Sequence, residues 1–546
     1  MQRKDCRLCF FTPILCGSLA VVCLLTLLHL ASINQVNASI AVSPLDVVIN
    51  EVAWMGTPNS ANDEWIELQN STSLPVDLTG WTLIASDGTP SISLSGSIPA
   101  GGYFLLERTD DTTVPSVTAD LIYTGGMGND GEYLVLRDDT AAVIDEVNSS
   151  SGWFSGQAEA RVPMLRVNTA VSGNDPDNWT YNPRCGSATN SAGVSHTCTL
   201  TETIVGTNLD YSVYFNPLAP TAIMTTTAQT PMEIALLSLI DNAGTTIDIA
   251  LYGLNRLSII NALIAAHNRG VTVRVVGDDD AATNEYSSFY QMLTDAGITI
   301  VTDASASQIQ HNKFLIVDGT VVWMGSTNFT DTGFTLNANN SVRITDTTLA
   351  NVYATEFEEM WAGNFHSAKT DNTTHLFNYN GTLVESYFSP TDVVAFEVWD
   401  ELAEADETIH FAMFFWTDSL LTDRVIEKLG DGVDVYGIFD QLGEANGSSG
   451  DEAMCAAGAQ IGTEGFVGKL HDKFAVIDVN GPDPTVILGS YNWTLSGAYD
   501  NDENTLIIHN AALAQAYYAE WQRLWDAIKL ENICNPGGLF IPFIIR

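Results

Sequence analysis

The stretch HNKFLIVD at residues 311–318 returns as HDKFAVID at residues 471–478, and these two copies decide the fold. In both copies His, Lys and Asp keep the same offsets, and Gly-Ser-x-Asn follows on the next apolar run, at 325–328 and 489–492. A two-part motif that recurs complete and in the same order indicates a duplicated domain.

Each copy has the composition of a buried strand that begins with polar side chains. Side chains at i and i+2 of a strand share one face, so His311 and Lys313 point the same way, as do His471 and Lys473. Two such halves facing each other would surround one space with two His, two Lys and the two motif Asn side chains. This set suits a phosphodiester, because Lys and Asn bind non-bridging oxygens while His attacks phosphorus or moves a proton.

The residues before each copy follow the order strand, helix, strand. The expected elements are 246–252, 258–269 and 271–276 in the first half, and 408–414, 421–429 and 433–439 in the second. This order is typical of a βαβ unit in a parallel sheet. We therefore expect two facing α/β halves, 208–370 and 382–530, joined by the polar segment 371–381.

Residues 46–198 have a different pattern, in which short apolar runs alternate with turn signals such as those at 87–88 and 129–131. Regular short strands with such turns predict a β-sandwich, with Trp65 and Trp81 in its core. The expected fold class is therefore multidomain, a β-sandwich followed by a bilobal α/β fold.

The two ends of the chain are expected to lie outside these domains. Basic residues precede an apolar run at 9–31, and residues 36–38 offer a small-residue cleavage site. Residues 1–38 are expected to be the signal peptide of an exported protein, with an uncleaved N-terminal membrane anchor as the alternative. Residues 531–546 are expected to form a C-terminal tail.

The Cys residues beyond the leader are Cys185, Cys198, Cys455 and Cys534. An even number in an exported protein predicts disulfides, and we expect the pairs Cys185–Cys198 and Cys455–Cys534. No metal site is expected, because Cys and His do not cluster. The acidic run 278–280 is expected to be a solvated loop, with calcium binding as the alternative.

The two copies resemble the signature of the phospholipase D superfamily, H-x-K-x4-D followed by G-S-x-N, over about 208–530. The resemblance implies a monomeric phosphodiester hydrolase that needs no cofactor or metal. One His forms a phosphohistidine, and the other protonates the leaving alcohol and then activates water. The implied catalytic residues are His311, Lys313, Asp318, His471, Lys473 and Asp478. The residues implied to bind phosphate are Asn328, Asn492, Ser326 and Ser490.

The β-rich segment resembles the lamin tail domain, an immunoglobulin-like fold, in the stretches 49–52, 63–70 and 76–83. In exported bacterial proteins such domains accompany hydrolases, including nucleases. The resemblance implies an accessory role and identifies no ligand.

The two halves differ at the position fourteen residues after the motif Gly, which is Asn339 in the first half and Glu503 in the second. Members of the phospholipase D superfamily often carry a carboxylate at this position that orients a catalytic His through Nδ1. We expect Glu503 to orient one His, in its own half or across the cleft, and to raise the pKa of that His. The more basic His would then be the general acid, and the other would attack.

Charge bears on the substrate. The chain has 66 Asp and Glu against 21 Lys and Arg, a formal net charge of -45. A groove that follows a nucleic-acid backbone uses on the order of 6–10 cationic contacts, and only twelve Lys and Arg lie between residues 200 and 530. The sequence therefore favours a phospholipid, with an extracellular nuclease as the alternative. A non-catalytic exported binding protein is a further hypothesis, but it predicts a broken motif, and both copies are complete.

Overall fold

The computed structural model divides into two compact units, an N-terminal β-rich unit and a larger α/β unit. It describes residues 42–56, 60, 62–111, 113–114, 117–156, 163–181, 188–192, 203–216, 229–305, 307–464, 468–527 and 534. The expected leader, the Cys185–Cys198 pair and all of the expected tail except Cys534 lie outside these residues. No helix within the described ranges combines the length and the apolar character that a membrane crossing requires.

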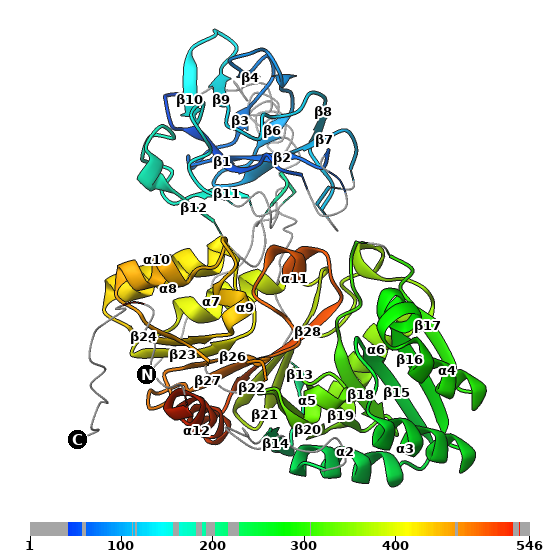
Figure 1. Ribbon diagram of the computed structural model, residues 1–546. Helices are drawn as coiled ribbons and strands as arrows, with labels where there is room; N and C mark the ends of the chain where they lie inside the picture. Colours follow the sequence, from blue (N-terminus) through cyan, green and yellow to red (C-terminus); the bar gives the residue numbers. More distant parts are fainter. Residues whose placement is uncertain are drawn as a thin grey trace, which may run out of the picture. The chain divides into compact units, whose positions relative to one another are not determined.

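The N-terminal unit is built from two main sheets and one small one (Figure 1). The strand orders are β12-β11-β1-β2-β7-β8, β10-β9-β4-β5 and β3-β6. The bounds are Val47–Ala53 (β1), Trp65–Asn70 (β2), Val76–Asp77 (β3), Thr82–Ala85 (β4), Ser91–Ser93 (β5), Ser97–Ile98 (β6), Tyr103–Arg108 (β7), Leu121–Tyr123 (β8), Tyr133–Arg137 (β9), Val143–Asn148 (β10), Met164–Arg166 (β11) and Trp179–Tyr181 (β12). Trp65 and Trp81 are buried, as expected.

A buried ion pair joins the two main sheets. Arg166 of β11 donates to Asp145 of β10 at 2.5 Å, and Asp145 also accepts from the backbone N–H of Ile49 in β1. A buried charge requires such a partner. The β-sandwich expected from the turn pattern is confirmed.

The first half of the α/β unit contains a seven-stranded sheet, in the order β14-β20-β19-β18-β15-β16-β17. Its strands are Tyr211–Phe215 (β14), Thr246–Leu251 (β15), Thr272–Gly277 (β16), Thr299–Thr302 (β17), Lys313–Val317 (β18), Val321–Gly325 (β19) and Asn340–Thr345 (β20). Its helices are Pro231–Asp241 (α2), Leu257–Asn268 (α3), Ser287–Asp295 (α4), Asp331–Thr335 (α5) and Thr347–Trp361 (α6), with a π-turn at Ala281–Glu285 (η2).

The second half repeats this order within a nine-stranded sheet, β13-β21-β22-β28-β27-β26-β23-β24-β25. Its strands are Thr203–Ile204 (β13), Leu376–Tyr379 (β21), Thr382–Ser389 (β22), Thr408–Met413 (β23), Asp434–Phe439 (β24), Gln460–Thr463 (β25), Lys473–Ile477 (β26), Thr485–Gly489 (β27) and Glu503–His509 (β28). Its helices are Val394–Ala403 (α7), Ser419–Asp431 (α8), Gln441–Glu444 (α9), Asp451–Ala457 (α10), Leu495–Tyr499 (α11) and Ala511–Ala527 (α12).

Two expectations need correction here. The sheets are mixed and not parallel throughout: β15 pairs in parallel with β16 but antiparallel with β18. The segment 371–381 is not only a connection, because β21 lies within it and pairs with β22. The segment is rich in Asn and Thr, a composition typical of a linker, and the few apolar residues of β21 lie within it.

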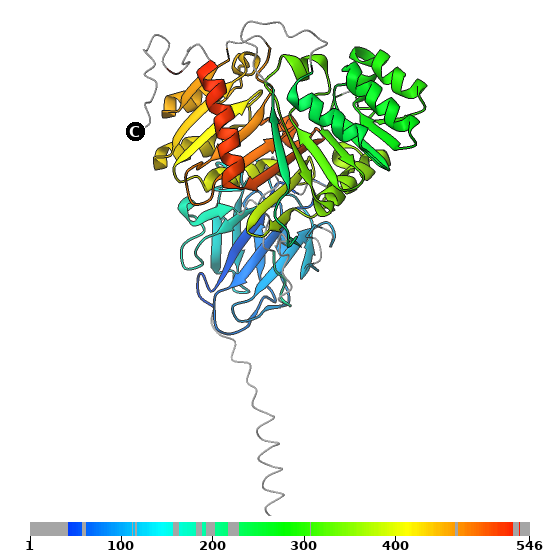
Figure 2. The same cartoon turned by 90° about the horizontal axis from the view of Figure 1, so that it is seen from below.

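Two long helices tie the halves together. Tyr353 of α6 packs edge-on against Phe314 of β18 and against Phe388 of β22, with ring centroids 5.1 Å apart in each pair. Tyr517 of α12 packs against Phe474 of β26 at 5.1 Å and against Phe215 of β14 at 5.0 Å. Each helix therefore contacts strands of both halves, and Figure 2 shows α12 crossing the second sheet beside β14.

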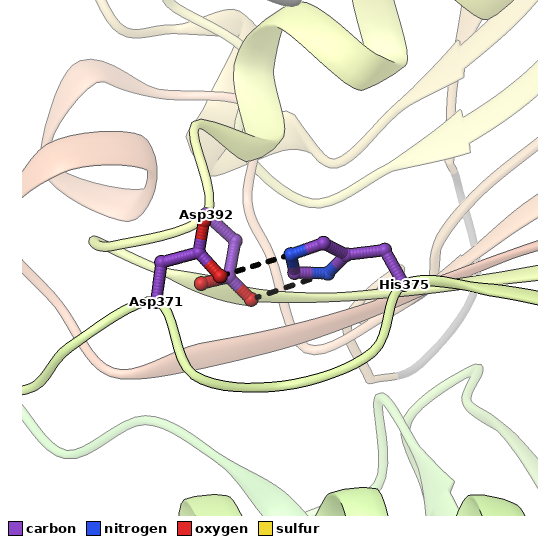
Figure 3. Close-up of side chains that lie close together, drawn as sticks. All are labelled: Asp371, His375 and Asp392. Carbon is purple, nitrogen blue, oxygen red and sulfur yellow. Dashed lines mark hydrogen bonds and ion pairs between the residues drawn. The ribbon is translucent and has the colours of Figure 1, made fainter. Parts of the chain in front are cut away.

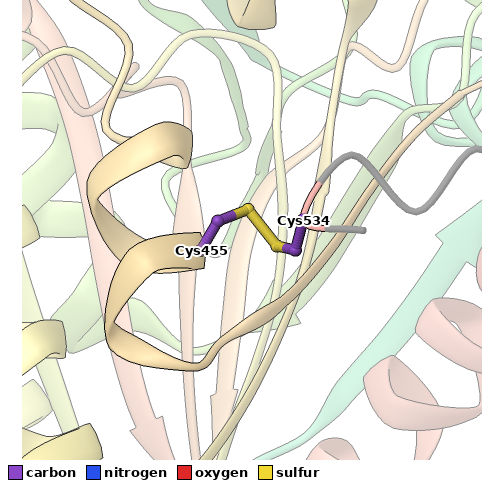
Figure 4. The surroundings of a disulfide bond; sticks show 2 residues. All are labelled: Cys455 and Cys534. Carbon is purple, nitrogen blue, oxygen red and sulfur yellow. A yellow bond between two sulfur atoms is a disulfide. The ribbon is translucent and has the colours of Figure 1, made fainter. Parts of the chain in front are cut away.

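The disulfide expected between Cys455 and Cys534 is present (Figure 4). It joins α10 to a residue beyond the end of α12. Cys534 is thereby fixed to the second half.

Candidate active site

Backbone hydrogen bonds between the halves position both motif histidines. The N–H of His311 donates to the carbonyl of Asp502 at 2.9 Å, and the N–H of His471 donates to the carbonyl of Ala338 at 2.9 Å. Asp502 precedes β28 and Ala338 precedes β20, so each contact crosses to the opposite half. The start of each motif strand is thus held by the other half, and the site exists only where the two halves meet.

The Nδ1 atoms of both histidines are also bound across this junction. His311 Nδ1 lies 2.7 Å from Glu503 Oε1. His471 Nδ1 lies 3.0 Å from Asn339 Oδ1 and 3.1 Å from the carbonyl oxygen of Ser326. The carbonyl can only accept, so Nδ1 of His471 donates, and Nε2 is left for chemistry. The carboxylate gives His311 the same tautomer.

Glu503 therefore orients the His of the other half, which resolves the alternative left open by the sequence. The expected rise in the pKa of that His is wrong for the site without substrate. Burial lowers the pKa of His311, and Lys313, Lys473 and His471 lower it further. Burial and the lysines likewise lower the pKa of His471. Burial also raises the pKa of Glu503 to about 8. The His311 tautomer with Nε2 free for attack is therefore the one in which Glu503 is ionised and accepts Nδ1–H.

The motif lysines lie on the same side as the histidines, as the strand alternation predicts. Lys313 Nζ donates to the carbonyl of His311 at 2.5 Å, and Lys473 Nζ to that of His471 at 2.8 Å. Both are buried. Burial lowers the pKa of Lys313 to about 7. Burial and repulsion from Lys313 hold the pKa of Lys473 well below its usual range. Two buried cations that repel each other form a site that an anion would stabilise.

The two motif Asn residues occupy equivalent positions in the two halves. Asn328 and Asn492 are partly buried and follow the Gly-Ser pairs at the ends of β19 and β27. Their Oδ1 atoms are buried and have no hydrogen-bond partner among the described residues. Buried amide oxygens without partners are uncommon in folded proteins. An amide oxygen only accepts, so a phosphate contact of these two side chains would come from their Nδ2 groups.

The motif serines have a different position from the expected one. Ser490 Oγ donates to Glu503 Oε2 at 2.5 Å, and Ser326 Oγ donates to Asn339 Oδ1 at 2.9 Å. Both serines are buried behind the groups that orient the histidines. The expectation that they bind phosphate is therefore replaced by a role in fixing Glu503 and Asn339.

The catalytic role expected for the two motif aspartates also needs correction. Asp318 follows β18 at the end opposite His311, where its carboxylate accepts from the backbone N–H groups of Gly244, Thr245 and Thr246 at 2.6–3.0 Å. Asp478 accepts from the backbone N–H groups of residues 406–408 at 2.6–2.7 Å. A five-residue strand is about 16 Å long, so these carboxylates stabilise turns and take no part in the chemistry.

Two interface contacts were missed from the sequence. Asn340 Nδ2 donates to Asp472 Oδ1 at 2.7 Å, and Asn504 Nδ2 donates to Asn312 Oδ1 at 2.8 Å. Each Asn thus crosses to the residue between His and Lys of the other motif. The signal was present, since Asn340 and Asn504 follow the motif glycines at equal spacing. The partner of each Asn lies in the opposite half, so the sequence of one half alone does not predict the contact.

Tyr252 and Phe414, at the ends of β15 and β23, were also missed. Their rings lie 5.3 Å from His311 and 4.8 Å from His471, respectively. They form apolar walls beside the two imidazoles.

Only part of the acidic run 278–280 is the solvated loop expected, because Asp280 is exposed and Asp279 half-buried, whereas Asp278 is buried. Asp278 is buried and accepts from the N–H of Ala281 at 2.8 Å, and burial raises its pKa to about 6. Asp278, Asp279 and Asp303 do bring three carboxylates together. Within the described residues, no such group of potential metal ligands includes His311 or His471.

Comparison with known proteins adds two families. The family described as "Cardiolipin synthase, PLD-like domain" matches residues 236–361 and 398–525, and the Lamin Tail Domain family matches 41–151. A phospholipase D of Rickettsia felis is 35% identical over 138 residues, which is 25% of this chain and 67% of the relative. A mitochondrial cardiolipin hydrolase of Xenopus laevis is 34% identical over 116 residues, which is 21% of this chain and 54% of the relative.

These alignments are partial on both sides. The chain spans 54–60% of the length of the cardiolipin hydrolases of Chlamydomonas reinhardtii, Xenopus laevis and Xenopus tropicalis. Among solved structures, the phospholipase D family member Nuc from Salmonella typhimurium is 31% identical, covers 28% of this chain and 96% of its own, and has a TM-score of 0.24.

Proposed function

This chain belongs to the phospholipase D superfamily and carries a lamin tail domain, and on that basis we propose that it is an exported phosphodiester hydrolase. The observation that carries the proposal is the crossed pairing of Nδ1 atoms, His311 with Glu503 and His471 with Asn339. It leaves two imidazole Nε2 atoms available between two lysines, which is the set that a two-step displacement at phosphorus requires.

In the first step His311 Nε2 attacks phosphorus and the bond to the leaving alcohol breaks. Glu503 then faces a positively charged phosphoimidazole, so the carboxylate stabilises charge that develops in this step. This assigns the nucleophile to His311 and reverses the roles expected from basicity alone. Lys313, Lys473, Asn328 and Asn492 bind the non-bridging oxygens.

His471 is the general acid in this scheme. Its Nε2 gives a proton to the leaving alkoxide, and the bound phosphate anion favours the protonated form that burial alone disfavours. In the second step His471 takes a proton from water, the water oxygen attacks phosphorus, and the N–P bond to His311 breaks. Both histidines return to their starting states.

A phospholipid is the substrate we favour. Most described cations of the α/β unit are already bound to carboxylates: Arg256 to Glu233, Arg274 to Asp248, Lys369 to Glu356, Arg424 to Glu427, Lys428 to Asp431 and Arg523 to Glu520. Few remain to follow a polynucleotide backbone. The curated relatives are a phospholipase D and cardiolipin hydrolases, and the apolar walls Tyr252 and Phe414 suit a lipid glycerol backbone.

Export is part of the same proposal. The basic and apolar N-terminal segment supports it, and so does the disulfide between Cys455 and Cys534, because disulfides persist in oxidising compartments.

A substrate panel tests the proposal. The protein lacking residues 1–38 is assayed on phosphatidylcholine, cardiolipin, single- and double-stranded DNA and a bis-aryl phosphodiester, beside the His311→Ala variant. We expect headgroup release from a phospholipid that the variant lacks. Turnover of DNA at a higher kcat/KM would establish the nuclease alternative, and turnover of none would leave only the binding-protein hypothesis.

A further inference from the structure

A second group of ionisable side chains lies at the other end of β28 from Glu503. His509 is the last residue of β28, and Glu385 of β22 and Glu401 of α7 approach it. Six residues of strand separate His509 from Glu503, a distance of about 20 Å. The group is therefore separate from the catalytic centre.

The distances within this group are not those of hydrogen bonds. His509 Nε2 lies 3.5 Å from Glu385 Oε1 and 3.6 Å from Glu401 Oε1, whereas N–H···O bonds measure about 2.7–3.2 Å. The three ligand atoms lie within 4.8 Å of one another. Ligands held about 2.0–2.2 Å from a tetrahedral zinc ion stand roughly 3.3–3.6 Å apart. The two His–Glu separations match that spacing.

The surrounding residues orient these atoms toward a common point. His509 Nδ1 lies 3.0 Å from Asp483 Oδ2 and 3.1 Å from Thr485 Oγ1, so Nδ1 is bound on that side and Nε2 faces the two glutamates. Metal-binding histidines are commonly held by a carboxylate in this way. Tyr387 donates to the other oxygen of Glu385, Oε2, at 2.5 Å.

Apart from these distances, two of the three side chains have polar atoms that lack hydrogen-bond partners within the described ranges. The side chain of Glu401 is 8% exposed, and its carboxylate faces His509 without a hydrogen-bond donor among the described residues. His509 Nε2 is itself buried and has no hydrogen-bond partner in the described part of the chain. Buried polar groups in this state are costly unless a cation or a proton accompanies them.

A second histidine group in the same half shows the contrast (Figure 3). His375 Nε2 lies 3.0 Å from Asp371 Oδ1, and Nδ1 lies 2.9 Å from the carbonyl of Ser386. Both ring nitrogens therefore donate at hydrogen-bond distance, unlike Nε2 of His509. Asp392 lies 3.9 Å from Nδ1 and adds to this charge pairing. No lone pair is left for a metal.

The first half lacks the corresponding donors. Aligning the repeated strand registers places Ser212 and Thr345 where the second half has Glu385 and His509. The offset between β15 and β23 places Leu239 where the second half has Glu401. Asp483 lies in residues 481–484, an insertion that the first motif hairpin does not have. The second half thus differs from the first at all these positions together.

We propose that Glu385, Glu401 and His509 bind a divalent transition-metal ion of the zinc class, with solvent as the remaining ligand. The mixed nitrogen and carboxylate set suits zinc and not calcium, which takes oxygen ligands. The ion ties β22, α7 and β28 together. Because His binds a metal ion only as the neutral imidazole, any proton on Nε2 of His509 is released on binding.

Calorimetric titration of ZnCl2 into untagged, chelator-treated protein tests this proposal. We expect one zinc per chain, a rise in Tm with zinc, and heats that vary with the ionisation enthalpy of the buffer. Glu401→Gln and His509→Gln should each weaken binding at least tenfold and remove the rise in Tm. The matched control His375→Gln, at the other histidine group, should bind zinc as the wild type does.

Two results would overturn the proposal. One is the absence of stoichiometric zinc binding by the folded wild-type protein. The other is zinc affinity unchanged in both Glu401→Gln and His509→Gln, which would place the ion elsewhere. Circular dichroism confirms folding of each variant, and turnover of the bis-aryl phosphodiester should stay near the wild-type value, so failure here is separable from failure of the catalytic proposal.

Discussion

Glu503 accepts a hydrogen bond from Nδ1 of His311 at 2.7 Å, although the two residues belong to different halves of the α/β unit. The equivalent acceptor for His471 is the neutral Asn339, at 3.0 Å. A site with two nearly equivalent halves is therefore electrostatically unequal. The predictions about catalysis depend on this inequality.

Replacing Glu503 by Gln should lower kcat by about 10²- to 10⁴-fold. The amide removes the charge that stabilises a phosphoimidazole, and its NH2 group can hold His311 in the wrong tautomer, as happens when a triad aspartate is made an amide. Steady-state kinetics on the bis-aryl phosphodiester measures the effect. A kcat within twofold of the wild type would show that Glu503 is only structural.

Asn339→Asp is the matched change in the other half. A carboxylate on Nδ1 of His471 stabilises the imidazolium, so the pKa of His471 rises and its proton is retained to higher pH. The alkaline limb of the pH–kcat profile should therefore move to higher pH. A limb that stays in place would mean that His471 is not the general acid.

The two histidines should differ when phosphoenzyme is trapped. An aryl leaving group of low pKa needs little general acid, so His471→Ala should still form a phosphohistidine and should accumulate it, because water is not activated. His311→Ala should form none. Rapid acid or base quench and peptide mapping identify the modified ring. Phosphate on residue 471 in the His311→Ala variant would reverse the assignment.

The lowered pKa of Lys313 predicts a second effect of pH, on kcat/KM. Its pKa is lowered to about 7, so the site without substrate loses this charge as pH rises above about 7. Since kcat/KM reports the free enzyme, it should fall above that pH. Lys313→Arg keeps its charge over this range, so the fall should disappear even though the rate is lower. Lys313→Ala should lose about 3–4 kcal/mol of transition-state stabilisation.

The repeated motif predicted most of the candidate site. Period-two alternation was sufficient to put His311 beside Lys313, because strand geometry fixes the faces of i and i+2. It could not decide the partner of Glu503. That choice depends on the exchange of backbone hydrogen bonds between Asp502 and His311 across the halves, a tertiary contact without a local signal.

The repeated spacing of the motif Asp residues was misleading for a physical reason. A residue that closes a turn recurs in both copies as faithfully as a catalytic one, because the same hairpin is built twice. Only the structure shows that Asp318 faces backbone N–H groups at the opposite end of β18 from His311. The strand β21 was missed for a related reason, since its pairing with β22 outweighs a polar local composition.

The corrected role of Asp318 has a consequence for acid stability. Its hydrogen bonds to residues 244–246 hold its pKa at about 2, below the unfolded value of about 3.9. A carboxylate whose folded pKa is lowered stabilises the fold above its unfolded pKa, and this contribution is lost as pH falls from about 4 toward 2.

Asp318→Asn should therefore lower the free energy of unfolding of the α/β unit at pH 7 by about 1–2 kcal/mol, allowing for solvent screening. Denaturant unfolding at pH 7 and pH 2.5 should show a gap between wild type and variant that narrows at the lower pH, while the turnover rate of the folded variant at pH 7 stays near the wild-type value. If turnover instead fell by about two orders of magnitude while the stability was unchanged, Asp318 would return to the catalytic set.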